Sequence, residues 1–310
     1  MGLNQKIIFH IMGLLLLFNG GFMLIAGVVS GICQDGVTLD ILLASIVSML
    51  IGMFAMFTTR GHKKEVKRKE GYLIVTFGWL VMSVSGMLPY LFSGAIPGVT
   101  NAFFETISGY TTTGASILDD IETLPKGILF WRSLTHWIGG MGIIVLAIAI
   151  LPLLGIGGMQ LFAAEAPGPS ADKLHPRITD TAKRLWYIYV GYTAAETVLL
   201  KLAGMSFFDA INHSLATLST GGFSTKNASL AFWNDNPMIQ YIVMFFMFLA
   251  GTNFVLSYYF FKGKVNRVTQ DEEFKLYFKF ILLFTLIAGF IIYFADTQVS
   301  SIDHPMVLGE

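Results

Sequence analysis

The sequence predicts an all-α polytopic membrane protein in which helix–re-entrant loop–helix repeats follow a two-helix hairpin. Three observations support this fold class. Of the 310 residues, 54% are hydrophobic and only 13% are charged, whereas soluble domains carry roughly a quarter charged residues. Apolar stretches near the roughly 20 residues that cross a bilayer recur along the chain. Between them lie two threonine- and glycine-rich segments, and such polar backbone enters a membrane only where protein or water covers it.

Seven apolar stretches are long enough to span a bilayer. The first is interpreted as a retained span and not as a signal peptide, because it is long and a second stretch follows at once. Two shorter apolar runs, 102–110 and 207–218, suit re-entrant or interfacial helices. The predicted spans are 7–31, 37–59, 72–92, 127–154, 185–204, 238–261 and 274–295.

The basic residues predict an orientation. Sixteen of the 20 Lys and Arg fall on one side of the predicted spans, most densely at 60–69. The positive-inside rule makes this side cytoplasmic. The N-terminus is therefore expected inside, and both short runs are expected to enter the membrane from the outside. The net charge is zero, so the composition gives no reason to expect a nucleic-acid partner.

The two polar segments form a repeat. Sliding the chain on itself by 108 residues places 111–116 over 219–224 without a gap, and self-similarity at a fixed period is more informative than either motif alone. The predicted organisation is an N-terminal hairpin (1–60), a basic cytoplasmic loop (61–71), a first helix–loop–helix repeat (72–155), a cytoplasmic loop (156–184), a second repeat (185–262) and the first helix of a third (263–310).

The repeated segments are predicted to form part of a cation selectivity filter. Successive backbone carbonyls can replace the hydration shell of an ion, and glycine permits the positive φ angles that align them. The short helix before each segment directs its partially negative C-terminal end at the ion path, which favours a cation. The candidate filter residues are Thr111, Thr112, Thr113 and Gly114 in the first segment and Ser219, Thr220, Gly221 and Gly222 in the second.

Longer motifs resemble those of a known family. Residues 104–115 look like the first pore loop of the Trk/Ktr potassium-transporter superfamily, and 136–147 and 151–161 resemble the helix that follows it. Residues 209–214 and 221–225 resemble the second pore loop. The additional N-terminal hairpin is similar to the TrkH/TrkG branch of this superfamily. The resemblance implies helix–pore loop–helix repeats, as in potassium-channel-like transporters.

The resemblance also implies a function and partners. It implies potassium uptake across the bacterial inner membrane, driven by the membrane potential, with K⁺ bound by the backbone carbonyls of Thr112, Thr113, Thr220 and Gly221. It further implies a homodimer gated by a cytoplasmic nucleotide-binding regulatory subunit (TrkA-like), and no covalently bound cofactor. Four pore loops are expected in the family and two are present here, so we expect a fragment or an assembly of several chains.

Two other functions were considered. A non-conducting fragment or membrane scaffold is consistent with the two missing pore loops. An intramembrane hydrolase would use Ser108 or Ser116 with His136 or His213, but the sequence has neither a Gly-x-Ser-x-Gly elbow nor an HExxH zinc pair. The single cysteine excludes a cysteine-based metal cluster. The protein is therefore not expected to be an enzyme.

Several polar residues near the two segments have structural interpretations. Glu105 and Asp209 begin the short apolar helices, where they could complement the helix N-terminus or attract cations to the mouth. His213 is expected to be a hydrogen-bonded core histidine. Glu196 lies centrally in its span and is expected to face protein, in a structural pair with Lys201 and not as a gate.

The span at 127–154 carries further signals. Arg132 and His136 are expected near the outer interface, where long polar side chains reach water. Gly139, Gly140 and Gly142 leave one face of the span bare, which predicts close packing against a re-entrant helix. The proline-containing segment 164–184 is either a docking surface for a cytoplasmic regulator or a solvated loop.

Overall fold

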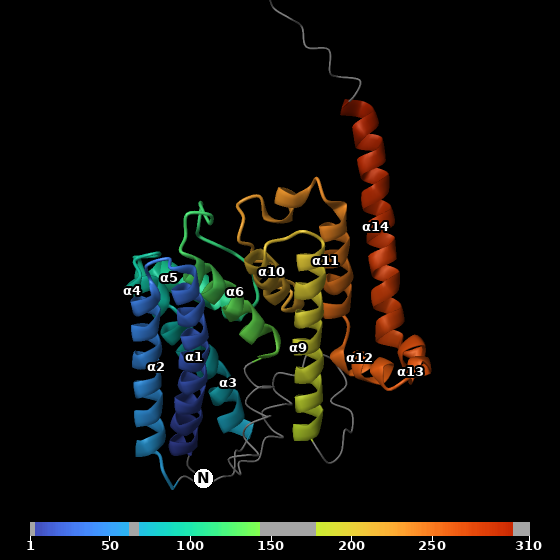
Figure 1. Cartoon of the computed structure of the whole chain (residues 1–310). Helices are drawn as coiled ribbons and strands as arrows, with labels where there is room; N and C mark the ends of the chain where they lie inside the picture. The colour runs from blue at the N-terminus through green and yellow to red at the C-terminus, as the bar shows by residue number, and fades with distance from the viewer. Residues whose placement is uncertain (1–3, 62–67, 143–177, 300–310) are drawn as a thin grey trace, which may run out of the picture. The chain divides into compact units, whose positions relative to one another are not determined.

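The structure is a computed structural model, and it describes residues 4–61, 68–142 and 178–299. Within these ranges every regular element is a helix, which confirms the predicted all-α fold class (Figure 1). The chain divides into two compact units, Met1–Gly251 and Thr252–Glu310. The predicted loop at 156–184 lies largely outside the described residues, so its proposed docking role is not addressed by the structure.

The first three predicted spans correspond to helices of the first unit. They are α1 (Gln5–Cys33), α2 (Thr38–Thr58) and α3 (Arg68–Gly86), which is followed by the single turn α4 (Leu88–Phe92). In the 18-residue apolar stretch of α1, 61% of the residues are buried, compared with 28% in that of α2. The helix α1 is therefore the inner helix of the hairpin. The two helices approach closely because a Cβ at Gly13 would lie 2.7 Å from the carbonyl oxygen of Gly52.

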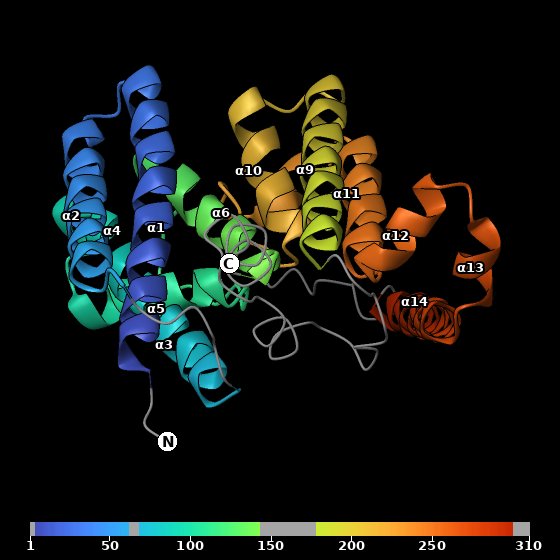
Figure 2. The same ribbon diagram turned by 90° about the horizontal axis from the view of Figure 1, so that it is seen from below.

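Two short helices occupy the predicted re-entrant runs. They are α5 (Val99–Tyr110) and α10 (Phe207–Leu218), each of 12 residues, which corresponds to about 18 Å at 1.5 Å per residue. This length is too short to cross a bilayer. Between them lies α6 (Lys126–Gly140), which packs against both, and Figures 1 and 2 show it passing between α5 and α10.

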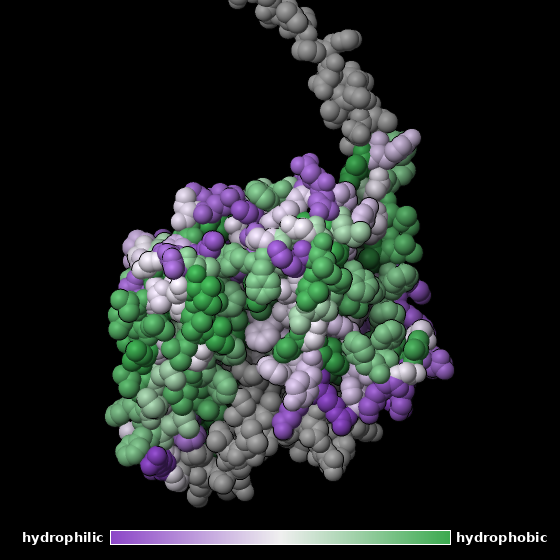
Figure 3. Space-filling view, viewed as in Figure 1, coloured by the Kyte–Doolittle hydropathy of each residue, from purple (hydrophilic) through white to green (hydrophobic). Residues whose placement is uncertain are grey.

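The first unit is completed by α9 (Ile178–Leu202), the 3₁₀ helix η1 (Ser229–Trp233) and α11 (Pro237–Ala250). The helix α9 packs against α10 and α11. In Figure 3 apolar residues cover the sides of α1 and α2, and polar residues gather at the two ends. This distribution is typical of helices that cross a membrane with their polar ends in water.

The second unit contains α12 (Phe254–Phe261), α13 (Val265–Gln270) and α14 (Glu272–Val299). The apolar window of α14, Glu272–Phe294, has no buried residue. A helix that is apolar on all sides needs lipid or further protein around it. The structure therefore agrees with the prediction that this segment is a membrane span.

The described helices account for only part of the seven predicted spans. Four of them are long and apolar enough to cross a membrane, or five if α11 and α12 form one span. The sixth predicted span, 238–261, consists of two helices with a break between Ala250 and Phe254. The fourth predicted span is described only to residue 142. The fifth corresponds to α9, which is not apolar enough to be counted as a membrane span because tyrosines, threonines and a glutamate interrupt its apolar residues.

Candidate functional site

The two loops that follow α5 and α10 have the same backbone conformation. Thr112 and Thr220 have φ angles of 53° and 58°, and Gly114 and Gly222 have φ angles of 75° and 85°. Each pair is separated by the 108 residues that the sequence repeat predicts. Positive φ is unusual for a β-branched residue such as threonine. The loops are therefore built alike in a conformation that the surrounding structure must hold.

Both short helices end in the same hydrogen-bonding motif. The N–H of Thr113 donates to the carbonyl of Ser108 (3.0 Å), and the N–H of Gly221 donates to that of Ala216 (2.9 Å). A second hydrogen bond, between residues three apart in the sequence, completes each motif. It runs from the N–H of Thr112 to the carbonyl of Gly109 (3.1 Å) and from the N–H of Thr220 to that of Thr217 (2.9 Å). This is the Schellman helix end, whose left-handed residue is usually glycine. Threonine takes that position in both loops.

The carbonyl oxygens of the loops are available to a ligand. No described residue donates a hydrogen bond to the carbonyls at 111–113 or 219–221. Thr111, Thr113 and Thr220 are also exposed. Backbone groups without partners are costly unless water or an ion satisfies them, and strained backbone of this kind gathers at functional sites. The arrangement can coordinate a cation through neutral oxygens.

The two loops contact each other directly. A Cβ added to Gly114 would overlap the carbonyl oxygen of Gly221. Only glycine can therefore occupy position 114 at this separation. The contact brings together the two halves of the predicted filter, which lie more than 100 residues apart in the sequence.

Glycines on α6 allow this helix to support both loops. A Cβ at Gly139 would overlap the carbonyl oxygen of Tyr110, the last residue of α5. A Cβ at Gly140 would lie 2.6 Å from the Cα of Ser219 in the second loop. The prediction that these glycines pack against a re-entrant helix is confirmed for Gly139, and Gly140 extends it to the second loop.

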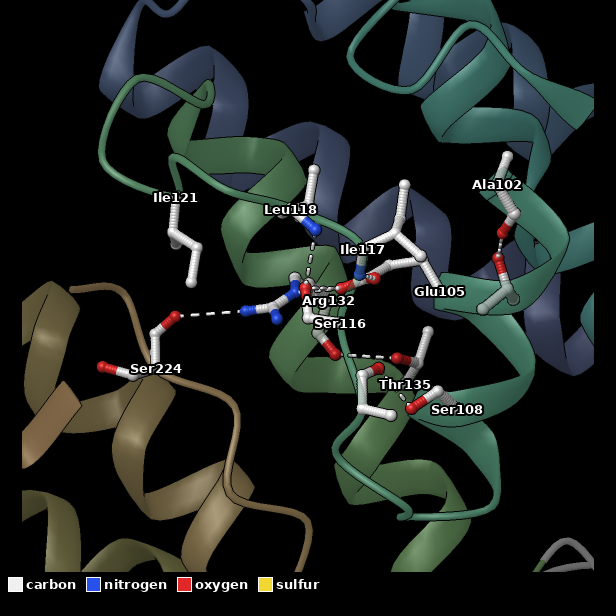
Figure 4. A network of polar contacts seen from close by, with 12 residues as sticks. Ala102, Glu105, Ser108, Ser116, Ile117, Leu118, Ile121, Arg132, Thr135 and Ser224 are labelled. Atoms are coloured by element: carbon white, nitrogen blue, oxygen red, sulfur yellow. Dashed lines mark hydrogen bonds and ion pairs between the residues drawn. The ribbon is translucent and has the colours of Figure 1, made fainter. Parts of the chain in front are cut away.

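A buried ion pair joins α5 to α6. Arg132 Nε lies 2.6 Å from Glu105 Oε1, and the two side chains are 2% and 0% exposed. Figure 4 shows that the same carboxylate accepts hydrogen bonds from the hydroxyl of Ser116 (3.0 Å) and the N–H of Ile117 (3.0 Å), just beyond the first loop. This favours the structural role for Glu105 over attraction of ions at the mouth.

The guanidinium of Arg132 also reaches the second loop. Its Nη1 donates to the carbonyl of Ser224 (3.2 Å), and its Cζ lies 3.6 Å from the centroid of the Phe223 ring. The imidazole of His136, one turn further along α6, stacks on the same ring at 3.7 Å between centroids. A cation over an aromatic face is attracted by the ring quadrupole. One face of α6 thus binds the segments beyond both loops.

Arg132 and His136 were expected to reach water near the outer interface, and this exposure to water is not found. Both side chains are buried. The sequence showed two polar side chains near the start of a span, where water is normally close, but the packing of α5 and α10 on α6 covers them. The signal that could have revealed Arg132 is its partner: Glu105 is the acidic residue that its guanidinium needs inside an apolar helix pair.

The corresponding position in the second repeat carries a histidine. Glu105 and His213 are 108 residues apart, as are Ser116 and Ser224. His213 Nε2 lies 2.9 Å from the hydroxyl of Ser224, so it takes the place of the carboxylate. Its Nδ1 lies 2.8 Å from the carbonyl of Asp209. The prediction of a hydrogen-bonded core histidine is confirmed.

Asp209 lies in the first turn of α10, and its hydrogen bonds show its structural role. Its N–H donates to the hydroxyl of Ser206 (3.0 Å), which caps the helix. Its carboxylate accepts hydrogen bonds from Ser206 (2.6 Å) and from Thr225 (2.6 Å), beyond the second loop. Asp209 therefore ties the beginning of α10 to the segment after the loop, a structural role that parallels that of Glu105.

Glu196 lies on α9 and is fully buried, as predicted. The expected pairing with Lys201 is not formed, because Lys201 is exposed and no ion pair joins them in the described part of the chain. Neither carboxyl oxygen of Glu196 forms a hydrogen bond of regular geometry with a described residue, and the side chain that interacts with it is Thr217 of α10. The prediction that it faces protein is confirmed, and the prediction of a structural pair is wrong.

The geometry does not assemble the hydrolase constellation. The hydroxyl of Ser108 donates to a backbone carbonyl (2.6 Å), and that of Ser116 donates to a carboxylate (3.0 Å). His213 contacts Ser224 instead, and no described residue hydrogen-bonds the ring nitrogens of His136. A serine nucleophile needs a base within hydrogen-bonding distance. Among the described residues there is also no group of His, Cys, Asp and Glu that could hold a metal ion.

The segments beyond the two loops are joined at the end of the unit opposite the N-terminus (Figure 1). Asn227 donates to Asp120 (2.9 Å) and, through its N–H, to Glu122 (3.1 Å). The hydrogen bond from Asn227 is the main cause that lowers the pKa of Asp120 below its ordinary value of 3.8. Both loops thus approach from one end of the unit.

The fold and the paired loops define the class of protein. Apolar helices with polar ends, and two short helices that end in matched loops, are those of an all-helical polytopic membrane protein built from helix–loop–helix repeats. The sequence model of the TrkH family, described as a cation transport protein, matches residues 38–303. The chain belongs to the TrkH family, which confirms the resemblance found in its motifs.

Individual relatives support this assignment. The Trk system potassium uptake protein TrkH of Escherichia coli (strain K12) is 44% identical over 296 residues, which are 93% of this chain and 61% of that protein. TrkG of the same strain is 34% identical over 290 residues, 93% of this chain and 60% of TrkG. This chain therefore spans about three-fifths of the length of these relatives.

A solved structure is similar as well. The crystal structure of the potassium transporter TrkH from Vibrio parahaemolyticus matches with a TM-score of 0.79 at 40% sequence identity. The match covers 92% of this chain and 58% of that protein.

Proposed function

We propose that this chain supplies two walls of a cation-conducting path and takes part in potassium uptake across the bacterial inner membrane. The observation that carries the proposal is the pair of loops at 111–114 and 219–222. They share their φ angles, contact each other and offer carbonyl oxygens that no described residue occupies. Such oxygens can replace the hydration shell of a cation. Potassium is supported by the relatives, which are potassium uptake proteins.

The ion ligands in this proposal are the backbone carbonyls of Thr112, Thr113, Thr220 and Gly221. The helices α5 and α10 end at these loops, and their partially negative ends favour a cation. The loops contain no Lys or Arg that would repel one. A membrane potential of 100 mV supplies about 2.3 kcal/mol per elementary charge, which is enough to concentrate potassium without coupled chemistry.

The proposal includes an orientation and partners. The N-terminus is cytoplasmic and both loops enter from the outside, as the basic residues indicate. The chain assembles as a homodimer with a cytoplasmic, nucleotide-binding, TrkA-like regulatory subunit, as the family resemblance implies. Because residues of both loops are exposed, the proposal also includes further polypeptide that covers the open side of the ion path.

A second candidate function is a non-conducting membrane scaffold. The exposure of Thr111, Thr113 and Thr220 favours it, because two walls do not enclose an ion. The two candidates differ in whether the chain binds and passes potassium when further pore loops are supplied.

Substitution of the paired glycines tests the filter. Gly114→Ser and Gly222→Ser should each lower the ratio of potassium to sodium flux by about fivefold or more, because a side chain at positive φ costs about 1–3 kcal/mol. The effect should be larger at position 114, where a Cβ would also overlap Gly221, than at 222, where the space is open.

Gly36→Ser is the matched control. Gly36 has a φ of 86° and open space around it, and it lies in the loop between α1 and α2. It carries the same backbone strain away from the ion path, so it should leave the flux ratio unchanged. An unchanged ratio in both the 114 and the 222 variants of transporting protein would contradict the filter assignment.

A further inference from the structure

We propose that Asn19, in the N-terminal hairpin, is a positioning residue for the first loop of the ion path. The inference rests on the proposed function and assigns the hairpin a part in ion selectivity. Asn19 acts through Tyr110, the last residue of α5, which directly precedes Thr111. The hydroxyl of Tyr110 donates a hydrogen bond to Oδ1 of Asn19.

This contact belongs to a chain of buried hydrogen bonds through the hairpin. Nδ2 of Asn19 donates to the hydroxyl of Ser85 (2.9 Å) and to the carbonyl of Met82 (3.3 Å), both on α3. The hydroxyl of Ser85 in turn lies 2.8 Å from that of Ser48 on α2. Asn19, Tyr110 and Ser48 are 0% exposed and Ser85 is 5% exposed. Four helices, α1, α2, α3 and α5, are therefore joined at one point.

The chain of hydrogen bonds is also directional. The amide of Asn19 uses its oxygen for Tyr110 and its nitrogen for α3, so its orientation is defined from both sides. A buried polar group that loses its partner pays its full desolvation cost. Tyr110 cannot turn away without leaving Asn19 unsatisfied, and its own carbonyl is pressed against Gly139. Both ends of Tyr110 are thus held where the loop begins.

Among the described residues, the second loop has no corresponding hydrogen bond. The residue 108 positions after Tyr110 is Leu218, which has no hydroxyl. The second loop instead meets His136 and Gly140 of α6, and Tyr189 of α9 donates to the carbonyl of Trp137 (3.0 Å) behind them. The two walls are therefore braced differently, and loss of the Asn19 contact should act on the first wall only.

The experiment is a double-mutant cycle measured as ion selectivity, with this chain co-expressed with the C-terminal part of a TrkH relative so that ions are transported. Asn19→Leu and Tyr110→Phe should each lower the ratio of potassium to sodium flux by on the order of threefold, the size of a typical buried hydrogen bond between membrane helices. The double variant should show less than the product of the two single effects, because both partners of one bond are then removed. Flux is normalised to the folded protein in the membrane.

Ser45→Ala is the matched control. Ser45 is 0% exposed and donates to the carbonyl of Gly20 (2.7 Å) within the same hairpin, but it has no place in the chain to Tyr110. It should leave the ratio unchanged. Were Asn19 merely structural, its substitution would reduce protein abundance and leave the ratio of the surviving protein at the wild-type value.

Two results would overturn the inference: an unchanged ratio in both single variants, or an equal change in Ser45→Ala. If Asn19→Leu does not fold, Tyr110→Phe, which removes only a hydroxyl, decides the question. The glycine variants separate this inference from the proposed function. A ratio that changes in Gly114→Ser but in neither Asn19→Leu nor Tyr110→Phe would leave the filter standing and reject only the role of the hairpin.

Discussion

At the scale of the residue, one guanidinium joins the parts that make up the candidate site. Arg132 pairs with Glu105 below the first loop, donates to Ser224 beyond the second, and covers the ring of Phe223. Burying an ion pair is costly and is repaid only when the geometry is good and the remaining donors are satisfied. The fork of arginine can meet these partners at once, whereas the point charge of lysine cannot.

This arrangement predicts that Arg132→Leu destabilises the protein strongly. It leaves the carboxylate of Glu105 buried without a counter-charge, which costs about 3–5 kcal/mol. Arg132→Lys should fall between this variant and the wild type, because it restores the charge but not the bond to Ser224. The measurement is the midpoint of thermal unfolding in detergent, followed by tryptophan fluorescence.

Lys226→Ala serves as the comparison. Its ion pair with Glu122 is 3.6 Å long, and the two side chains are 23% and 39% exposed. Ion pairs of this kind contribute only about 0–1 kcal/mol. A midpoint for Arg132→Leu that is no lower than that of Lys226→Ala would show that the buried pair does not hold the two loops together.

At the scale of the element, the two short helices and the loops that follow them are built alike and tied together at both ends. Both helices pack against α6, and the segments after the loops meet through Asn227. The positions 108 residues apart carry different side chains, as at 105 and 213, yet hold the corresponding serine in each repeat. The two repeats therefore share their backbone geometry, although the side chains at corresponding positions differ.

The contact between these segments predicts a dependence on acid. The pKa of Asp120 is lowered in the folded protein, chiefly by the hydrogen bond from Asn227. A lowered pKa means that the ionised form is favoured by folding. Its contribution is therefore present above the ordinary value of 3.8 and is lost as the pH falls through the lower, folded value.

Asp120→Asn, which cannot ionise, should lose less stability than the wild type when the pH is lowered below this range. The readout is the unfolding midpoint as a function of pH. Asp119→Asn is the control, because Asp119 is an exposed neighbour and the side chain of Asn227 donates to Asp120 instead. Identical acid profiles for Asp120→Asn and the wild type would exclude the role of this contact.

At the scale of the whole molecule, the open side of the loops is the dominant feature. Exposed threonines at the ends of two buried helices are consistent with an ion path that further polypeptide completes. The exposed apolar surface of α14 also needs covering by lipid or protein. The chain spans about three-fifths of the length of its relatives.

This view predicts complementation. In cells that lack potassium uptake, residues 1–310 expressed by themselves should support little or no rubidium uptake, because two walls do not enclose an ion. Co-expression with the remaining C-terminal part of a TrkH relative should restore it, and Gly114→Ser in this chain should reduce the restored selectivity. Failure of every such combination, with both parts present in the membrane, would favour the scaffold.

The sequence by itself determined the features that depend on local chemistry. Apolar length predicted the first three long helices and both short ones, since a lipid bilayer requires about 20 apolar residues to be crossed. The 108-residue register and the glycines anticipated the positive φ angles of Gly114 and Gly222, because glycine has no Cβ to forbid them. The glycines of α6 signalled close packing, because a missing side chain is visible in any sequence.

Only the tertiary structure decided which polar groups meet. Glu105 and Arg132 lie 27 residues apart, Arg132 and Ser224 lie 92 apart, and Asn19 and Tyr110 lie 91 apart. A polar side chain in an apolar helix indicates that a hydrogen-bond or charge partner is needed, but the identity of the partner depends on how the helices cross. That packing arises from many weak contacts summed over the whole unit, so no single stretch of sequence records it.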